Sequence, residues 1–246
     1  MSALVIEGLS RNFGGLRALS NVSFSVEAGE RRLIIGPNGA GKTTLFNLLS
    51  GVFKASSGRI SLFGRDVTGL SMHERARMGL ARTFQITNLF PRLSVMDNLL
   101  IALQAGAPGA FSLTRRMRDQ TVLHAQADAL LNQWGLASIA MRAAREISYG
   151  EQRQVDLILA MAMQARVLLL DEPMAGLSAA EVVRVTGMIR SLPREMTILL
   201  IEHDMDVAFE LADRIAVLHQ GCLIAEGDGP TIRAHPQVSE IYLGVE

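Results

Sequence analysis

The first 30 residues alternate apolar and polar side chains, as in the segment Val22–Val26. This period of two is typical of strands with one face buried and one face in water. Gly14-Gly15 and Gly29 supply turn signals between the alternating segments. We therefore expect antiparallel strands here, and the segment 59–67 repeats the pattern as a second hairpin.

A second pattern dominates the rest of the chain, where short aliphatic runs alternate with segments of helical periodicity. Val155, Ile158, Leu159 and Ala162, for example, recur at the spacing of one helix face. Aliphatic strands separated by helices are typical of a parallel sheet with both faces covered. Short strands are expected over 31–35, 81–85, 167–170, 197–201 and 215–219. Helices are expected over 42–50, 95–103, 114–134, 150–163, 179–190 and 204–212, with a loop rich in Gly, Ala and Pro over 105–112.

Composition removes several classes of protein. The chain carries 24 Lys and Arg against 24 Asp and Glu, so the basic surface of a dedicated nucleic-acid binder is not indicated. With 49% hydrophobic residues, a packed core is expected and disorder is not. We expect neither a membrane span, which takes roughly 20 apolar residues, nor a secretory signal. Cys222, the single cysteine, excludes an internal disulfide.

Residues 36–43 carry the strongest chemical signal. They read Gly36-Pro37-Asn38-Gly39-Ala40-Gly41-Lys42-Thr43, which satisfies the pattern G-x-x-x-x-G-K-[ST] between a predicted strand and a predicted helix. In such a loop, glycines let backbone N–H groups converge on phosphate oxygens, and the helix N-terminus adds positive partial charge. Lys42 can then reach the β- and γ-phosphates, and the Thr43 hydroxyl can bind Mg²⁺. The alternative is a glycine-rich turn without a ligand.

Two carboxylates follow the predicted strand 167–170. Asp171 and Glu172 are expected at its C-terminal end, where parallel sheets normally bind ligands. Because adjacent side chains point in different directions, Asp171 can address a metal while Glu172 faces an attacking water. This division suits hydrolysis. The alternative is that the pair is only a polar strand terminus.

Three further polar residues are candidates for the site because of their positions relative to predicted strands and helices. His203 follows the predicted strand 197–201, so it should reach the same sheet edge and read a γ-phosphate; alone it would be a cap or a surface residue. Gln85 closes the strand before the helical region and could sense metal and water. Ser148 precedes the predicted helix 150–163, whose capped N-terminus could bind an anion.

In this order along the chain, these motifs resemble the motif set of ABC-type ATPases, over essentially the whole sequence. The resemblance implies an α/β fold, a P-loop NTPase with a RecA-like core, an antiparallel β subdomain and an inserted α-helical subdomain. It implies one ABC ATPase domain over 1–246, with the β and nucleotide-binding core at about 1–86 and 164–246 and the helical subdomain at about 87–163. The phosphate motifs are the specific part of the resemblance.

The resemblance also implies roles for individual residues. Phe13 matches the aromatic residue that stacks on adenine, and Ala175 to Ser178 matches the D-loop, although many relatives have Asp where this chain has Ser178. Lys42, Gln85, Glu172 and His203 are implied to be catalytic, and Thr43, Gln85 and Asp171 to bind Mg²⁺. The residues implied to bind ATP are Phe13, Gly36, Pro37, Asn38, Gly39, Ala40, Gly41, Lys42, Thr43, Thr44, Ser148, Gly150 and Glu151.

The signature segment has Tyr149 and Glu151 where many family members have Gly and Gln. Its Ser-Tyr-Gly-Glu-Gln form looks like that of branched-chain amino acid importers, and Arg82-Thr83-Phe84-Gln85 strengthens this likeness. The resemblance therefore implies an ATPase subunit, peripheral on the cytoplasmic face of the cell (inner) membrane. Implied partners are membrane permeases, indirectly a solute-binding protein, and a second ATPase subunit, either a copy or a paralogue, with no nucleic acid.

Two matters stay open in the sequence. A soluble ABC ATPase of DNA repair or translation, or the ATPase of an exporter, would share the phosphate chemistry, although no coiled-coil insertion or basic patch points to the first. The apolar side chains of Leu89, Phe90, Val95 and Leu99 could line a groove for a short helix of a membrane subunit, or they could be ordinary core.

Overall fold

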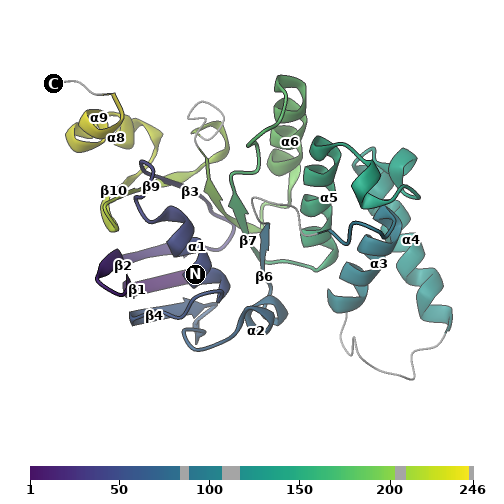
Figure 1. Ribbon diagram of the computed structural model, residues 1–246, viewed down its shortest axis with the longest axis horizontal. Coiled ribbons are helices and arrows are strands. Elements are labelled where there is room, and N and C mark those ends of the chain that lie inside the picture. Colours follow the sequence, from purple (N-terminus) through teal and green to yellow (C-terminus); the bar gives the residue numbers. More distant parts are fainter. Residues whose placement is uncertain (84–88, 107–116, 203–208, 244–246) are drawn as a thin grey trace. The chain divides into compact units, whose positions relative to one another are not determined.

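Two β-sheets organise the part of the chain that the computed structural model describes, residues 1–83, 89–106, 117–202 and 209–243 (Figure 1). The described strands, in chain order, are β1 (Ser2–Phe13), β2 (Leu16–Glu27), β3 (Arg31–Ile35), β4 (Ser57–Leu62), β5 (Arg65–Asp66), β6 (Leu80–Thr83), β7 (Val167–Asp171), β8 (Thr197–Ile201), β9 (Arg214–His219) and β10 (Cys222–Gly227).

The first sheet is antiparallel, with strand order β2-β1-β4-β5. Ile6 of β1 lies opposite Phe24 of β2 on one side and Ile60 of β4 on the other, and all three side chains are buried. The alternating pattern therefore places one face of each strand in the core. The predicted antiparallel strands and the predicted hairpin over 59–67 are both confirmed.

The second sheet has the order β10-β9-β3-β8-β7-β6. The strand pairs β9–β3, β3–β8 and β8–β7 are parallel, and β10 joins β9 as an antiparallel edge strand. Every residue of β3, β7 and β8 is buried. Burial on both faces explains the aliphatic runs within these strands, which are 33–35, 167–170 and 198–201, and the predicted parallel sheet is confirmed.

The helices follow the predicted periodicity closely. Helix α1 begins and ends where predicted, with Gly51 as its left-handed C-cap. Helix α3 continues through Ala105 and Gly106, so the prediction that the loop begins at 105 is wrong by two residues. The described helices are α1 (Lys42–Ser50), α2 (Met72–Arg77), α3 (Val95–Gly106), α4 (Met117–Gln133), η1 (Ala137–Ile139), η2 (Ala144–Glu146), α5 (Tyr149–Ala162), α6 (Ala179–Ser191), α8 (Gly229–Arg233) and α9 (Pro236–Leu243).

Several short elements have local signals that the periodicity does not use. Helix α2 begins with a capping box formed by Ser71 and Glu74, in which the Ser71 amide donates to Glu74 Oε2 at 2.8 Å. Strand β10 follows β9 through a two-residue loop, Gln220-Gly221, both residues having positive φ. Of the helix predicted over 204–212, only residues 209–212 lie in the described part, and 209–211 are helical.

The described residues divide into two compact units. Unit 1 comprises 1–82, 166–172 and 192–246, and unit 2 comprises 83–165 and 173–191. In unit 1, α1 packs its buried Leu45, Phe46 and Leu49 into one core with apolar residues of both sheets. Because α1 starts at the glycine-rich loop, this core fixes the position of that loop.

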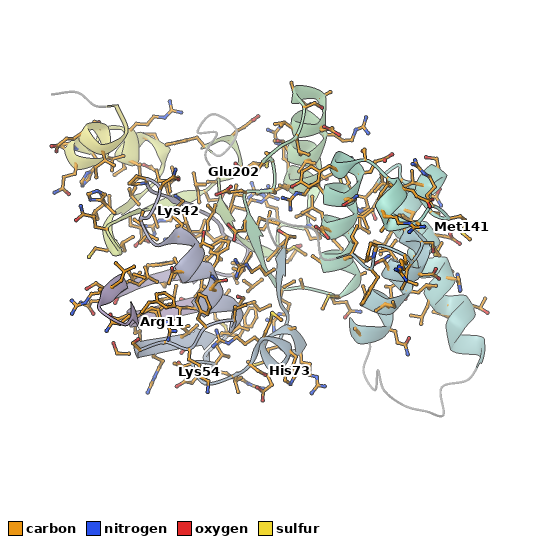
Figure 2. All side chains as sticks on the ribbon, in the orientation of Figure 1. Arg11, Lys42, Lys54, His73, Met141 and Glu202 are labelled. Carbon is orange, nitrogen blue, oxygen red and sulfur yellow. The ribbon has the colours of Figure 1, made fainter. Side chains whose placement is uncertain are left out.

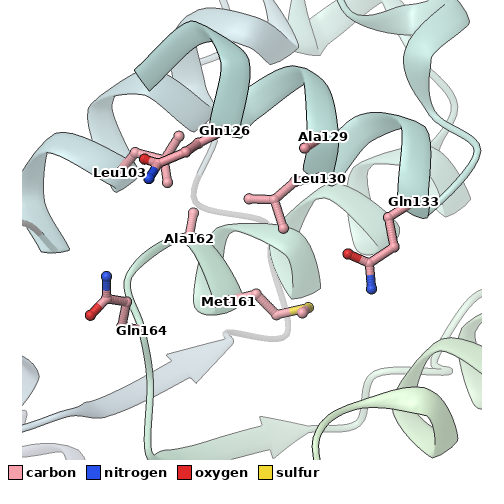
Figure 3. Close-up of a pocket in the computed structure, with 8 residues that line it drawn as sticks. All are labelled: Leu103, Gln126, Ala129, Leu130, Gln133, Met161, Ala162 and Gln164. Carbon is pink, nitrogen blue, oxygen red and sulfur yellow. The ribbon is translucent and has the colours of Figure 1, made fainter. Parts of the chain in front are cut away.

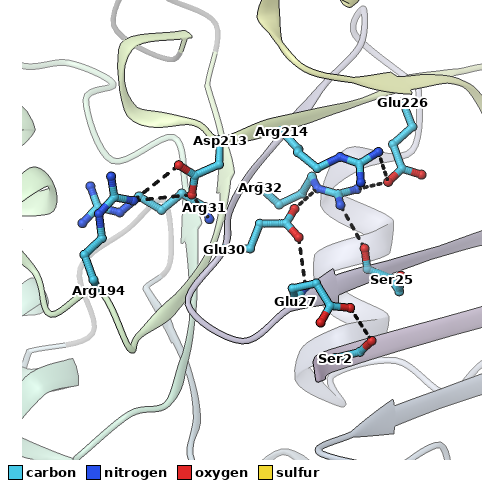
Figure 4. Close-up of polar contacts among 10 residues, drawn as sticks. All are labelled: Ser2, Ser25, Glu27, Glu30, Arg31, Arg32, Arg194, Asp213, Arg214 and Glu226. Carbon is cyan, nitrogen blue, oxygen red and sulfur yellow. Dashed lines mark hydrogen bonds and ion pairs between the residues drawn. The ribbon is translucent and has the colours of Figure 1, made fainter.

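A buried arginine joins the two sheets of unit 1 at another point (Figure 4). Arg32 of β3, 1% exposed, bonds Glu30 through Nε at 2.6 Å and Glu226 of β10 through Nη1 at 2.8 Å. Its Nη2 donates to the carbonyl of Ser25 on β2 at 2.9 Å. Three partners on separate segments satisfy one guanidinium, which is the usual condition for burying a charge.

Candidate functional site

The glycine-rich loop connects β3 to α1, as the motif requires. A Cβ atom on Gly36 would lie 2.2 Å from the carbonyl oxygen of Leu218, so the backbone leaves no room for a side chain at this position. Gly41 is the N-cap residue of α1 and offers no side-chain acceptor to the first turn of that helix. The first amides of α1 are therefore left for an external anion. Asn38 and Gly39, at the middle of the loop, are exposed.

Lys42 folds back over this loop (Figure 2). Its Nζ donates to the carbonyls of Gly36 at 2.5 Å and Pro37 at 3.1 Å, and the residue is 6% exposed. Burial lowers the pKa of Lys42, while the charges of Glu172 and Asp171 act to raise it. The ammonium thus lies within electrostatic reach of both predicted carboxylates, all in unit 1.

The strand ends bring the acidic residues to the same edge as the loop. Ile201, the last residue of β8, pairs with Asp171 of β7 on one side and with Ile34 of β3 on the other. The loop, Asp171-Glu172 and Glu202 therefore follow three adjacent parallel strands at one C-terminal edge. Asp171 is 5% exposed, and Glu202 is also buried. This arrangement confirms the sheet geometry on which the site prediction depends.

Glu172 has an unusual backbone. Its φ is 49°, in the left-handed region that non-glycine residues rarely adopt. Its amide donates to the carbonyl of Ile201 at 2.9 Å, which fixes the turn immediately after β7. Backbone strain of this kind clusters at functional sites, because the surrounding structure must hold it in place.

The donors near the loop fit a Mg²⁺ ion brought by a nucleotide. Thr43, in the first turn of α1, is exposed and carries a hydroxyl, and Asp171 supplies a carboxylate. Mg²⁺ prefers such oxygen ligands, and it is commonly held by one or two protein groups together with phosphates and water. Among the described residues, no group of three or more His, Cys, Asp or Glu side chains could hold a metal by itself.

Phe13 ends β1 and is 38% exposed. Its ring packs edge-on against Phe53 with centroids 5.4 Å apart, and the Arg11 guanidinium lies 4.5 Å from the Phe13 centroid. The Arg11 Nη1 donates to the carbonyl of Lys54 at 2.8 Å, which fixes the guanidinium over the ring. Phe13 thus has a fixed orientation and an exposed surface.

In unit 2, Ser148 caps α5 as predicted. The Ser148 Oγ accepts from the Glu151 amide at 3.2 Å, and the Ser148 amide donates to Glu151 Oε2 at 2.7 Å. The Glu151 carboxylate is thereby turned toward the cap. A Cβ atom on Gly150 would lie 2.1 Å from Glu181 Oε1, so a side chain at this position would force the Glu181 carboxylate to move.

The D-loop segment ends in another cap. Glu181 Oε2 accepts from the Ser178 hydroxyl at 2.6 Å and from the Ser178 amide at 2.9 Å, at the start of α6. An ionised Asp at this position could not donate to Glu181 as the Ser178 hydroxyl does, so this contact depends on the serine. Glu181 therefore links the D-loop to the glycine of the signature segment, within unit 2.

Two predicted residues, Gln85 and His203, lie outside the described residues. Of the four apolar residues considered for a docking groove, Val95 and Leu99 are fully buried and belong to the core, whereas Phe90 is 54% exposed. Unit 2 also contains an open pocket of about 280 Å³ between α3, α4 and α5 (Figure 3). None of the residues predicted to bind nucleotide lines this pocket. Its lining residues are Leu103, Gln126, Ala129, Leu130, Gln133, Met161, Ala162 and Gln164.

One charged residue at the site was not assigned a role from the sequence. Arg82 of β6 bonds Asp171 at 2.7 Å, and both side chains are buried. The sequence did show that Arg82 lies inside a predicted strand. If that strand is buried, its arginine needs a buried hydrogen-bond acceptor. The sequence does not say which acceptor it meets.

Comparison with known proteins identifies a family match that includes the residues described above. Residues 19–175, which include the glycine-rich loop and the Asp171-Glu172 pair, match the family model described as "ABC transporter". This chain belongs to the ABC transporter family. Within the described residues, no helix has both the length and the apolar character needed to cross a membrane.

Family members with similar sequences are transport proteins by name. The high-affinity branched-chain amino acid transport ATP-binding protein LivG of Salmonella typhimurium is 41% identical over 98% of this chain and 97% of its own length. The corresponding protein BraF of Pseudomonas aeruginosa is 38% identical, with the same coverage.

Two solved family structures match the fold over the full length of both chains. A nucleotide-free ATP-binding cassette from an ABC transporter has a TM-score of 0.85 at 31% identity. The ADP conformation of an ATP-binding cassette of an ABC transporter has a TM-score of 0.85 at 30% identity. The α/β P-loop NTPase fold expected from the sequence is therefore confirmed.

Proposed function

We propose that this chain is the subunit that binds and hydrolyses ATP in an ABC importer for branched-chain or related amino acids. The observation that carries the ATPase part is the shared sheet edge of Lys42, Asp171 and Glu172. The names of the LivG and BraF relatives support import and the amino-acid class.

At the proposed site, the first amides of α1 and the Lys42 ammonium bind the β- and γ-phosphates of ATP. To do so, Lys42 gives up its bonds to the Gly36 and Pro37 carbonyls. Thr43 and Asp171 hold the Mg²⁺ that accompanies ATP, with Gln85 at the same ion. Mg²⁺, when bound, neutralises charge that develops on the phosphate oxygens. Phe13 stacks on the adenine, and the loop from Gly36 to Thr44 surrounds the phosphates.

Glu172 accepts a proton from the attacking water, whose oxygen bonds to the γ-phosphorus as the bond to the β-phosphate oxygen breaks. The products are ADP and phosphate. His203 stabilises the transferring phosphoryl group. The Ser148 hydroxyl and the Gly150 amide contact the γ-phosphate of ATP held by a second ATPase subunit, and Glu151 fixes Ser148 through the capping box between them. The working pair is a homodimer or a heterodimer with a paralogue, peripheral on the cytoplasmic face of the inner membrane.

The first test is ATP hydrolysis by the purified chain with and without Mg²⁺. Lys42→Ala should abolish nucleotide binding, whereas Lys54→Ala is a matched control, because Lys54 is the other lysine of the chain and is exposed. Equal nucleotide affinity in both variants would remove Lys42 from the site.

The second test concerns import. The tagged chain is purified from detergent-solubilised membranes of its host, washed with MgATP and examined by mass spectrometry. Two permeases and a second ATPase subunit are expected, and the candidate amino acids can then be tested on that complex for stimulated hydrolysis. Recovery of DNA-repair or ribosomal partners alone would leave the ATP chemistry in place and overturn the import assignment.

A further inference from the structure

Arg82 lies on β6, the edge strand of the six-stranded sheet, next to the strand that ends in Asp171. Its Nη2 bonds Asp171 Oδ2 at 2.7 Å, and the two side chains are only 4% and 7% exposed. At this depth, water does not screen the pair as it screens a surface ion pair. The contact therefore constrains the orientation of the carboxylate.

The other arm of the same guanidinium reaches α1. Arg82 Nη1 donates to Asn47 Oδ1 at 2.7 Å and to Ser50 Oγ at 3.1 Å. The guanidinium carbon also lies 5.8 Å from the centroid of the Phe46 ring. One planar group thus connects the helix that begins with Lys42-Thr43 to the carboxylate at the end of β7, within unit 1.

This geometry has a consequence for metal binding. Because Oδ2 is bonded to the guanidinium, Oδ1 is the more available oxygen for a metal, and the bond fixes the rotation of the carboxylate about its side-chain bond. A lysine could not bond Asp171, Asn47 and Ser50 in the same way. Its ammonium is a compact charge, whereas the planar guanidinium donates to several acceptors in fixed directions.

We propose that Arg82 is a positioning residue for the Mg²⁺ of bound MgATP. Through Oδ2 it orients Asp171 toward the metal, and through Asn47 and Ser50 it fixes the spacing between Asp171 and Thr43. This inference rests on the proposed function, since it assumes that Asp171 and Thr43 bind the metal of a nucleotide.

The test measures the affinity of the purified full-length chain for a fluorescent ATP analogue, in excess EDTA and across a Mg²⁺ titration. Arg82→Gln should raise the half-saturating Mg²⁺ concentration tenfold or more, which is the usual effect of losing a group that orients a metal ligand. Its affinity in EDTA should stay within twofold of the wild type. Arg82→Lys should behave like Arg82→Gln, because charge alone does not replace the fork.

The control is Arg59→Gln, which removes an exposed ion pair with Asp66 at 3.4 Å and should change neither affinity. Asn47→Ala keeps the bond to Asp171 but loses one anchor on α1, so it should shift the Mg²⁺ dependence in the same direction by a smaller factor. This variant also covers the case in which Arg82→Gln fails to fold.

Three results would overturn the inference. One is wild-type Mg²⁺ dependence in folded Arg82→Gln, or in Asn47→Ala if Arg82→Gln does not fold. Another is recovery of wild-type Mg²⁺ dependence by Arg82→Lys, which would reduce the role of Arg82 to charge. A third is an equal loss of affinity with and without Mg²⁺ together with a lower unfolding midpoint, which would mean a structural ion pair. If the wild-type chain itself binds no nucleotide in either condition, the proposed function fails, and this inference with it.

Discussion

The amide of Glu172 donates to the carbonyl of Ile201 at 2.9 Å, one residue beyond the last strand pair, Asp171 and Ile201. This bond holds Glu172 at φ 49°, a conformation that costs a non-glycine residue about 1–2 kcal/mol. The chain thus turns sharply after Asp171. Asp171 and Glu172 can therefore serve different atoms of one reaction although they are adjacent in sequence.

Glu172→Gln should lower ATP hydrolysis about 100-fold or more, because it removes the proton acceptor and keeps the shape of the side chain. ATP binding should persist, and the closed dimer should accumulate, as measured by size-exclusion chromatography with ATP. Rapid turnover by this variant would contradict the role of Glu172. Glu172→Gly should lose hydrolysis equally while its free energy of unfolding stays within about 1 kcal/mol of the wild type, since glycine adopts φ 49° without strain.

Gly150→Ala should separate the signature segment from the D-loop. Its Cβ would displace the Glu181 carboxylate, which also caps Ser178, so we expect a stability loss of about 1 kcal/mol and at least a tenfold loss of hydrolysis. Gly187→Ala is the matched control, because Gly187 lies on α6 with open space around it. It should stabilise the protein by about 0.5–1 kcal/mol. Equal stability losses in both variants, measured by urea unfolding, would count against the steric argument.

Asp156 should make stability depend on pH. Burial raises its pKa to about 7, the charge of Arg153 opposes that rise, and within the described chain its Oδ2 has no hydrogen-bond partner. The pKa of this carboxyl is higher in the folded protein than in the unfolded chain, where it is near 3.8. Its contribution to stability is therefore fully present at pH values below 3.8. That stability is lost as pH rises through about 7. From this group, the free energy of unfolding should be higher at pH 5.5 than at pH 8 by about 1–2 kcal/mol. Asp156→Asn should remove that difference, and an unchanged pH dependence would show that Asp156 is not the group responsible.

Arg75→Met should destabilise the protein by about 2–4 kcal/mol, because it leaves buried carbonyls without a donor. Arg75 is 1% exposed, and its guanidinium donates to Leu48, Leu49, Leu70 and Thr68 carbonyls at 2.5–3.1 Å. Arg77→Met, on the same helix but exposed, should change stability by less than about 0.5 kcal/mol. Urea midpoints of the two variants give the comparison, and similar values would contradict the buried-donor argument.

Much of the fold could be predicted because its signals are local or periodic. Continuous aliphatic strands identified the parallel sheet, and the glycine-rich loop had to lie between β3 and α1 for its motif to work. The cap at Ser148 was also readable, since Ser and Glu three residues apart form a capping box.

The other features depend on contacts between distant segments. Nothing near Arg82 in the sequence names Asp171 as its partner, 89 residues away, or Asn47, 35 residues away. The positive φ of Glu172 likewise comes from its bond to Ile201 and not from its own preference, since glutamate rarely adopts it. Such features follow from tertiary packing, which periodicity and propensity do not encode.

The bonds of Arg32 have a mechanical consequence. Because one buried guanidinium connects β2, β3 and β10, a force applied to either sheet of unit 1 is shared by the other through bonds shorter than 3 Å. The glycine-rich loop leaves β3 three residues after Arg32 itself. The two sheets of unit 1 are therefore joined close to the strand end from which the glycine-rich loop begins, so a displacement of either sheet should be felt at that loop.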